Sequence, residues 1–179
     1  MDKMFLIPAV DLETVKEKYI DVIEKTPGME HTARWVYGKH PDDKLLSDYI
    51  NNGEMYLLMD DDKVAGMVAI VMHQEPDYEP VSWQEKLAND EVATLRLLTV
   101  CMEYRGRSLG NRILEEAIRI SEENGKKALR LDTLKSNLPA QHMYDRAGFS
   151  FRGEQRLYEE SLGWADFYYY EKTLDNDNG

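Results

Sequence analysis

The segment Arg105-Gly106-Arg107-Ser108-Leu109-Gly110 lies between two runs of residues with different periodicity. Before it, Glu91–Met102 is rich in Val, Leu and Thr without strict alternation, which predicts a strand buried on both faces. After it, apolar residues recur at helical spacing from Leu109 and stop at Asn124-Gly125. A strand that turns directly into a helix leaves the first helical N–H groups unpaired, and these groups can bind a phosphate or pyrophosphate.

The residues of this segment suit such an anion. Gly106 and Gly110 allow close approach of the backbone, and Arg105 and Arg107 add positive charge for phosphate oxygens. The segment lacks the Gly-Lys-Ser/Thr ending of a P-loop and the third glycine of a dinucleotide-binding fingerprint. By itself, it indicates no more than a basic turn.

Composition limits the class of protein. The chain has 179 residues, of which 42% are hydrophobic, and this is enough for one domain with a sizeable core. Its formal net charge of -12 disfavours nucleic-acid binding and mildly favours a cationic substrate. No apolar run approaches the ~20 residues of a membrane helix, and Met1–Val10 is unlike a signal peptide. With a single cysteine, Cys101, we expect a cytoplasmic protein that does not associate with membranes.

The rest of the chain predicts further helices and strands from periodicity and turn residues. They are a strand at Met4–Ala9, helices at Asp11–Thr26 and Asp42–Asn51, strands at Met55–Met59 and Val64–Met72 joined by a turn at Asp60–Lys63, a loop at Gln74–Asn89 with a helical turn at Trp83–Leu87, a strand at Ala128–Thr133, a helix at Pro139–Ala147, and strands at Phe151–Tyr158 and Ala165–Thr173. This order predicts an α/β (α+β) mixed sheet with helices on both faces. We expect one domain over residues 1–174 and a frayed tail over residues 175–179.

A second segment gives the first one its meaning. About 30 residues downstream stands Asn137-Leu-Pro-Ala140-Gln-His-Met-Tyr144-Asp-Arg-Ala-Gly148-Phe149. Together with the segment from Arg105 to Gly110, it resembles the signature of the GNAT superfamily of acetyl-CoA-dependent N-acetyltransferases. That signature is an Arg/Gln-x-x-Gly-x-Gly/Ala loop followed by an Asn and a Leu-Tyr-x-x-x-Gly-Phe ending. The resemblance covers roughly Glu91–Phe151 by motif and the remainder by element order.

Ser108 departs from the signature, because the family usually has glycine at this position. A serine restricts the backbone and would weaken cofactor binding if it cannot adopt the glycine conformation. Its hydroxyl is alternatively a donor to a phosphate oxygen.

The resemblance implies a GNAT acyl-CoA N-acyltransferase fold, whose central sheet is mostly antiparallel with splayed fourth and fifth strands. Free backbone groups of the fourth strand would bind the pantetheine arm of acetyl-CoA as an added strand, and one N–H would polarise the thioester carbonyl. The implied cofactor-binding residues are Leu98, Val100, Arg105, Gly106, Arg107, Ser108, Leu109, Gly110, Asn137 and Tyr144.

The resemblance also assigns catalytic roles. Tyr144 matches the usual general acid, although an aromatic packed under Gly148-Phe149 would look the same in sequence. Asn137 matches a cofactor contact and can equally cap the helix that follows it. For the base, Asp132 and Glu91 are both candidates, and a water chain is the third alternative.

The acceptor pocket is the least defined part of the site. Aromatic and acidic residues in two loops can hold a cationic amine or simply pack, and they are Glu30, Trp35 and Tyr37 in one loop and Tyr78 and Trp83 in the other. Cys101 has no histidine motif beside it and is not expected to be a nucleophile. The histidines have no metal-ligand spacing, so we expect no metal; they are His31, His40, His73 and His142.

The leading hypothesis is an N-acetyltransferase that transfers acetyl from acetyl-CoA directly to a primary amine of a small molecule or peptide. The alternative is a non-catalytic acyl-CoA-binding sensor or a degenerate family member. A protein-interaction domain that uses Phe167–Tyr170 is a third hypothesis, but this run is more simply a sheet strand that can also serve a homodimer contact.

Overall fold

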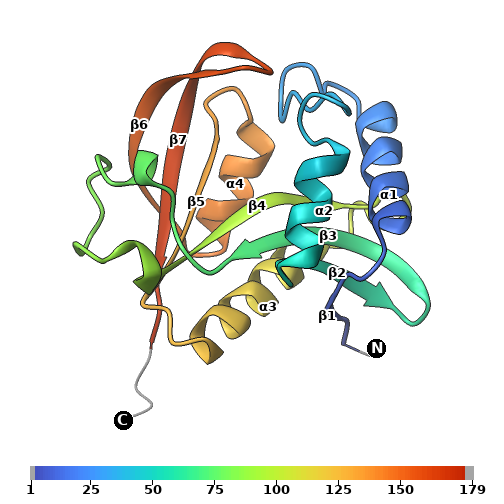
Figure 1. Ribbon diagram of the computed structural model, residues 1–179, viewed down its shortest axis with the longest axis horizontal. Coiled ribbons are helices and arrows are strands. Elements are labelled where there is room, and N and C mark those ends of the chain that lie inside the picture. The colour runs from blue at the N-terminus through green and yellow to red at the C-terminus, as the bar shows by residue number, and fades with distance from the viewer. Residues whose placement is uncertain (1–2, 176–179) are drawn as a thin grey trace.

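The structure is a computed structural model that describes residues 3–175. The expected tail falls mainly on residues 176–179, which lie outside the described residues. The elements follow the order that the sequence predicts (Figure 1). In chain order, they are β1 (Phe5–Pro8), α1 (Leu12–Lys25), α2 (Asp43–Asn51), β2 (Met55–Asp60), β3 (Lys63–Val71), the 3-10 turns η1 (Pro76–Tyr78) and η2 (Asn89–Glu91), β4 (Val92–Val100), the 3-10 turn η3 (Met102–Tyr104), α3 (Leu109–Glu123), β5 (Ala128–Leu134), α4 (Leu138–Arg146), β6 (Ser150–Glu159) and β7 (Gly163–Thr173).

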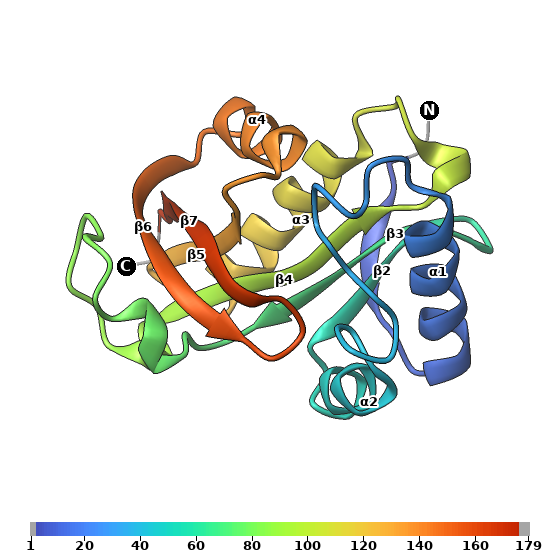
Figure 2. The same cartoon turned by 90° about the horizontal axis from the view of Figure 1, so that it is seen from above.

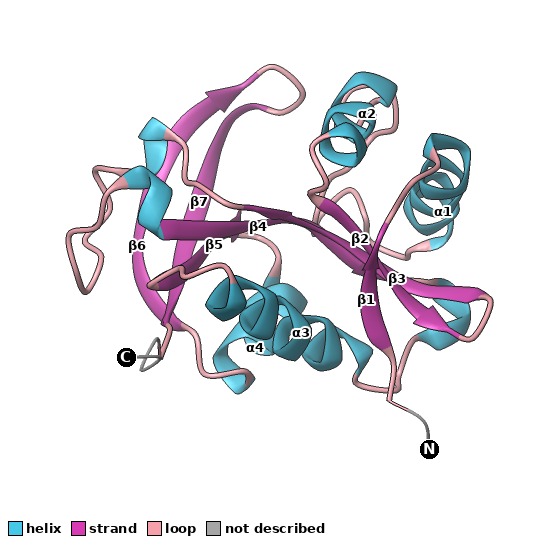
Figure 3. Ribbon diagram, turned by 60° about the horizontal axis from the view of Figure 1, so that its bottom comes forward, coloured by secondary structure: helices cyan, strands magenta, loops and turns pink. Residues whose placement is uncertain are grey.

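Within residues 3–175, these strands form one seven-stranded sheet in the order β1-β2-β3-β4-β5-β7-β6. Neighbouring strands are antiparallel except β4 and β5, which are parallel. Helices α1 and α2 cover one face of the sheet, and α3 and α4 cover the other (Figure 3). This arrangement confirms the mixed sheet with helices on both faces. None of the helices in the described part of the chain is long and apolar enough to cross a bilayer.

The first helix illustrates how local sequence sets the elements. The Asp11 side chain accepts hydrogen bonds from the N–H groups of Glu13 and Thr14, so the helix begins at Leu12. Its apolar stripe, which includes the fully buried Tyr19, faces the sheet. The helix therefore forms where capping and periodicity both predict it.

The loop between β3 and β4 differs from expectation. Residues 83–87 form no helical turn; the turns are η1 and η2, on either side. Trp83 is held instead by its Nε1–H, which donates to the Tyr78 carbonyl at 2.7 Å, and by stacking on the Tyr78 ring at 5.8 Å. These tertiary contacts override the weak local helical preference of the segment.

The parallel ladder between β4 and β5 is short. Only Val92–Thr94 pairs with Ala128–Arg130. Beyond this point, β5 stays paired with β7 as far as Leu134, and β4 stays beside β3 as far as Val100. Figure 2 shows β4 running away from β5 and β7. The splayed fourth and fifth strands implied by the resemblance are therefore present.

A bulge in β4 lies within the separated part of the strand. Met67 pairs with Thr99 and Ala69 pairs with Arg96, so two β4 residues stand opposite one β3 residue. One of them, Leu97, has a φ of 56°, which is unusual for a non-glycine residue. The buried Tyr19 hydroxyl donates to the Leu97 carbonyl at 2.7 Å and so helps to hold this conformation.

A buried arginine ties the β3–β4 loop to the sheet. Arg130 on β5 is fully buried, and its Nε lies 2.8 Å from Glu171 Oε2 on β7. The same guanidinium donates to the Gln74 side chain at 2.8 Å and to the Glu85 carbonyl at 3.0 Å, and it lies 4.2 Å from the Trp83 ring centroid. The loop is therefore fastened at several points to β5 and β7.

This network yields a stability prediction. Replacing Arg130 by Met leaves the Glu171 carboxylate buried without its Nε donor, which should lower the free energy of unfolding by about 3–5 kcal/mol. The matched change Arg156→Met removes an exposed ion pair with Asp166 on the β6–β7 hairpin, where the loss should be about 0–1 kcal/mol. Urea unfolding of the two variants measures the difference. Equal, small losses would contradict the role given to Arg130.

Candidate active site

A cavity of about 230 Å³ lies where β4 and β5 separate. Acidic residues predominate among the side chains that line it, with one arginine between them. The lining residues are Glu75, Asp77, Arg96, Asp132, Leu157, Glu159, Phe167 and Tyr169. A cavity with this charge suits a small cationic group.

Asp132 and Tyr144 lie on opposite faces of the sheet. Paired residues of antiparallel strands share a face, and successive residues alternate between faces. Asp132 pairs with Tyr169, which lines the cavity, whereas Leu131 pairs with Tyr170. The Tyr144 ring packs on Tyr170 with centroids 5.8 Å apart, so Tyr144 belongs to the face covered by α3 and α4. The gap between β4 and β5 is where groups from the two faces approach each other.

Two donors hold the Asp132 carboxylate. Arg96 Nη1 on β4 lies 2.6 Å from Asp132 Oδ2, and the Tyr78 hydroxyl donates to the same oxygen at 2.5 Å. The Asp132 side chain is only 15% exposed. Its charge is therefore compensated within the protein, as a partly buried carboxylate requires.

Two other carboxyl groups at the cavity have altered acidity. Partial loss of solvent raises the pKa of Glu159, and the negative charges of Asp132 and Asp77 raise it further. Loss of solvent also raises the pKa of Asp77, and this effect exceeds the opposing effect of Arg96. These carboxyl groups therefore hold protons more readily than exposed ones do.

Tyr144 is a buried phenol on α4. Burial raises the pKa of its hydroxyl above the ordinary value, and the negative charge of Asp132 raises it further. No residue within the described range 3–175 forms a hydrogen bond with this hydroxyl in the structure. Tyr144 is therefore a protonated hydroxyl that remains available as a donor near neutral pH.

The amino end of α3 has the features of an anion site. Asp11, Asp42 and Asn137 cap their own helices with side-chain oxygens, whereas Ser108 forms no side-chain cap. The first turn of α3 contains no acidic residue. Its first N–H groups therefore meet neither a capping oxygen of their own nor a repelling carboxylate.

The turn before α3 has a conformation that favours glycine. Gly106 has a φ of 81°, and no atom within 4 Å would meet a Cβ there, so the turn faces open space. Ser108 has a φ of 57° and a ψ of 28°, so this serine already adopts the left-handed conformation that glycine adopts without strain. The geometry therefore fits a phosphate group at the start of α3.

The arginines of this turn have partners within the protein. Arg105 Nε donates to the Val100 carbonyl at 2.9 Å, and its Nη2 donates to Thr26 Oγ1 at 3.2 Å. The Arg107 guanidinium lies 5.2 Å from the centroid of the Tyr104 ring. Both side chains are exposed and carry charge beside the start of α3, but Arg105 also fastens the end of β4 to α1.

A direct contact joins the two signature segments. A Cβ placed on Gly110 in α3 would lie 2.4 Å from Met143 Sδ in α4, so the two helices meet at this glycine. Met143 immediately precedes Tyr144. Asn137 caps α4 through a hydrogen bond from the Ala140 N–H at 3.4 Å. The turn before α3 and the buried phenol are therefore held in one packed unit.

Glu91 lies apart from these groups. It ends η2, immediately before the part of β4 that pairs with β5, and it forms an ion pair with Lys127. It also accepts the Ala88 N–H, and these hydrogen bonds lower the pKa of its carboxyl group, the one from Lys127 most strongly. The structure therefore does not bring Glu91 to the cavity with Asp132.

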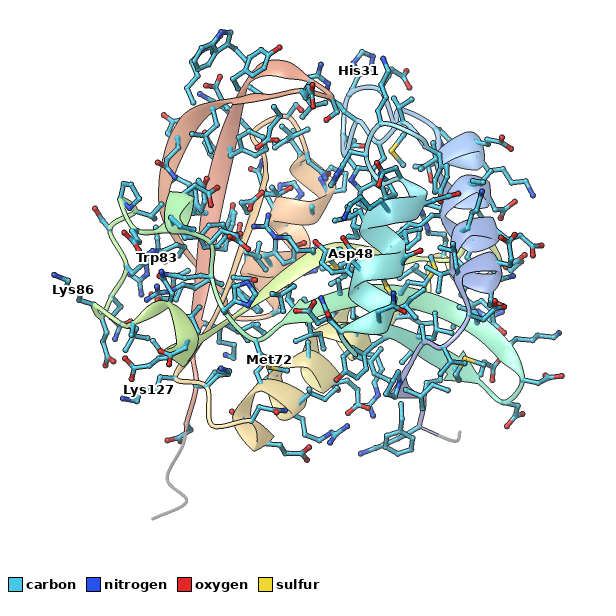
Figure 4. The ribbon with its side chains drawn as sticks, viewed as in Figure 1. His31, Asp48, Met72, Trp83, Lys86 and Lys127 are labelled. Carbon is cyan, nitrogen blue, oxygen red and sulfur yellow. The ribbon has the colours of Figure 1, made fainter. Side chains whose placement is uncertain are left out.

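Trp83 does not lie with the other residues expected in an acceptor pocket. Trp83 packs on Arg130 and lines a different cavity, of about 570 Å³, under the β3–β4 loop. Trp35 packs edge-on against Tyr19, and the Tyr37 hydroxyl donates to Asp43 at 2.6 Å. Figure 4 shows Trp83 far from His31, which is the neighbour of the exposed Glu30.

Sequence reasoning missed four charged lining residues: Glu75, Asp77, Arg96 and Glu159. Arg96 carried a usable signal, because a charge inside the apolar run Val92–Val100 requires a partner. Glu75 and Asp77 lie at the start of the β3–β4 loop and Glu159 lies at the end of β6, where no periodic pattern indicates the direction of a side chain.

Comparisons with known proteins bear on the family of the chain. The profile of the acetyltransferase (GNAT) family matches residues 23–149. A Bacillus subtilis (strain 168) protein, provisionally assigned as a ribosomal protein bS18-alanine N-acetyltransferase, is 32% identical over 71 residues, which is 40% of this chain. This chain therefore spans about half of that relative, 47% of its length.

Solved structures show the same fold at low identity. A GNAT-family acetyltransferase from Listeria monocytogenes 4b F2365 superposes with a TM-score of 0.71 and 24% identity, covering 96% of this chain and 95% of its own. A provisionally assigned acetyltransferase from Salmonella typhimurium, solved with its cofactor acetyl-CoA, gives a TM-score of 0.69 and 15% identity and covers 99% of this chain and 98% of its own. The family profile spans more than half of the sequence and the fold agrees, so the chain belongs to the acetyltransferase (GNAT) family of acyltransferases.

Proposed function

We propose that the protein transfers an acetyl group from acetyl-CoA to a primary amine of a small molecule or peptide. The observation that carries the proposal is that Asp132 lies beside the gap between β4 and β5, with Tyr144 on the opposite face of the sheet. A proton donor on one side and a proton acceptor on the other meet the needs of acyl transfer to an amine.

The residues around the start of α3 fit the donor. The N–H groups of Ser108, Leu109 and Gly110, with the charges of Arg105 and Arg107, would hold its pyrophosphate. The backbone of Leu98 and Val100 would hold the pantetheine arm, and Asn137 would contact it from the start of α4. When bound, acetyl-CoA supplies an acetyl group activated as a thioester.

Tyr144 would donate the proton that the departing sulfur needs. Burial raises the pKa of its hydroxyl, so the phenol keeps its proton at neutral pH until a developing negative charge draws it away. Packing against Phe149 and Tyr170 fixes the ring, with centroid distances of 5.9 and 5.8 Å. The hydroxyl is therefore positioned before the reaction begins.

Asp132 would receive the proton of the amine. The acidic cavity draws a protonated amine toward the gap, and a neutral amine is needed for attack. Asp132 is the lining carboxylate that stands on β5, beside the gap, whereas Glu159 stands on β6 and Asp77 in the β3–β4 loop. Glu91 has no part in this scheme because it is paired with Lys127 away from the cavity.

The cavity limits what enters. A volume of about 230 Å³ accepts an amino group with a few attached atoms, such as one end of a polyamine or the first residue of a peptide. One relative is provisionally assigned as a ribosomal protein bS18-alanine N-acetyltransferase, so a peptide with a free amino-terminal alanine is a natural first acceptor to test.

The experiment measures release of CoA from acetyl-CoA by the purified protein. Acceptors are a short peptide with an amino-terminal alanine, its amino-blocked form and spermidine. We expect release with at least one free amine and none with the blocked peptide. Binding of acetyl-CoA without release for any amine would favour the non-catalytic acyl-CoA-binding alternative.

Removal of the Tyr144 hydroxyl should slow the reaction. Tyr144→Phe keeps the ring packing, so the Kd of acetyl-CoA should stay unchanged while kcat falls by roughly 10²–10⁴. Tyr168→Phe is the matched control, because Tyr168 lies on the same face of β7 as Tyr170. Calorimetry and steady-state kinetics give both values. An undiminished kcat would remove Tyr144 from the mechanism.

Replacement of Ser108 by Gly should stabilise the protein. The left-handed conformation strains serine, so Ser108→Gly should raise the free energy of unfolding by about 1 kcal/mol and Tm by about 2–4 °C. Acetyl-CoA binding should be retained, because the free protein already has the conformation that glycine would adopt. Ser82→Gly, at an exposed loop serine without a positive φ, should give no rise. Equal changes in Tm for both variants would show that Ser108 is unstrained.

A further inference from the structure

The β3–β4 loop contributes one fully buried tyrosine to the site. Tyr78 ends η1, and its ring packs edge-on against Tyr169, with centroids 5.1 Å apart, and stacks on Trp83. Its hydroxyl donates to Asp132 Oδ2 at 2.5 Å, across 54 residues of sequence. Apolar packing alone would be satisfied by phenylalanine, so the hydroxyl serves the carboxylate.

Arg96 approaches the same oxygen from the other side of the gap. Its Nη1 lies 2.6 Å from Asp132 Oδ2, and its guanidinium lies 5.2 Å from the centroid of the Tyr78 ring. Both donors therefore bind one carboxylate oxygen. Within residues 3–175, no group donates a hydrogen bond to Asp132 Oδ1.

This asymmetry restricts the carboxylate. Rotation about the Cβ–Cγ bond would break two charge-assisted hydrogen bonds at once. Oδ2 is consequently fixed by the protein, and Oδ1 is left as the acceptor for a group that enters the cavity lined by Asp132.

The position of Tyr78 is itself fixed by buried contacts. The Trp83 Nε1–H donates to the Tyr78 carbonyl, and the Trp83 ring lies on the Arg130 guanidinium. Arg130 also binds Glu171 on β7 and the Glu85 carbonyl in the loop. The loop is thus a rigid support and holds the Tyr78 hydroxyl at one place.

We propose that Tyr78 and Arg96 are positioning residues for amine acetylation, which hold Asp132 Oδ2 so that Oδ1 receives the proton of the acceptor amine. The proton leaves the amine nitrogen, is carried on Oδ1 and then passes to water. The proposal rests on the proposed function, because it assigns Asp132 the role of proton acceptor.

The test is a double-mutant cycle with Tyr78→Phe and Asp132→Asn. Tyr78→Phe removes one hydroxyl and keeps the ring, and it should lower kcat roughly tenfold with an unchanged Kd for acetyl-CoA. In the Asp132→Asn background, the same change should have little further effect. Tyr56→Phe, on β2 away from the cavity, is the control and should leave kcat unchanged. Circular dichroism and Tm establish that each variant folds.

The same double-mutant cycle can be measured without turnover, with the Kd of spermidine determined by calorimetry in the absence of acetyl-CoA. We expect Tyr78→Phe to weaken amine binding only when Asp132 is present. Equal, additive effects of Tyr78→Phe in both backgrounds, in kcat and in Kd, would overturn the positioning proposal while leaving the proposed function intact. Coupled binding without any CoA release by the wild type would contradict the proposed function alone. If the wild type released no CoA and the two substitutions were not coupled in amine binding, both the proposed function and the positioning proposal would be overturned.

Discussion

The early end of the β4–β5 ladder is the constraint on which the candidate site depends. Parallel strands normally stay paired and buried, but here pairing stops after Thr94 and Arg130. Backbone groups near such a gap must find other partners. Two β4 carbonyls do so with side chains, because Leu97 accepts the Tyr19 hydroxyl and Val100 accepts Arg105 Nε. These bonds tie the part of β4 that has left β5 to α1 and its carboxyl end.

On the two faces of the sheet, the groups of the candidate site are held by different kinds of contact. On one face, a buried ion pair between Arg130 and Glu171 supports the loop that carries Tyr78. On the other face, the absence of a side chain at Gly110 lets α4 pack on α3, and this places Tyr144. Rigid supports of this kind suit a site whose groups must be in place before the substrates arrive.

Much of the fold was predictable because its helices and strands follow periodicity and capping. The stripe of α3 and the cap at Asp11 are local signals, and local signals survive in sequence. The bulge at Leu97 was not predictable, because Val92–Val100 contains neither glycine nor proline to indicate it. The bond between Tyr78 and Asp132 joins residues 54 positions apart, and no local pattern specifies such a contact. The family signature indicated the turn before α3 and the helix that carries Tyr144, whereas Trp83, chosen by residue type alone, packs on Arg130 under the β3–β4 loop.

The basic and acidic parts of the candidate site lie in different places around the gap between β4 and β5. In the proposed reaction, one substrate carries phosphates and the other an ammonium group, and a chain with a net charge of -12 attracts only the second. The phosphates require a region of local positive charge on this acidic chain. Arg105, Arg107 and the amino end of α3 supply it. The acidic cavity lies on the face to which Asp132 points, whereas Tyr144 packs on the other. The acidic cavity for the amine is thus separate from the basic turn for the phosphates. The gap in the sheet is where the two substrates can meet.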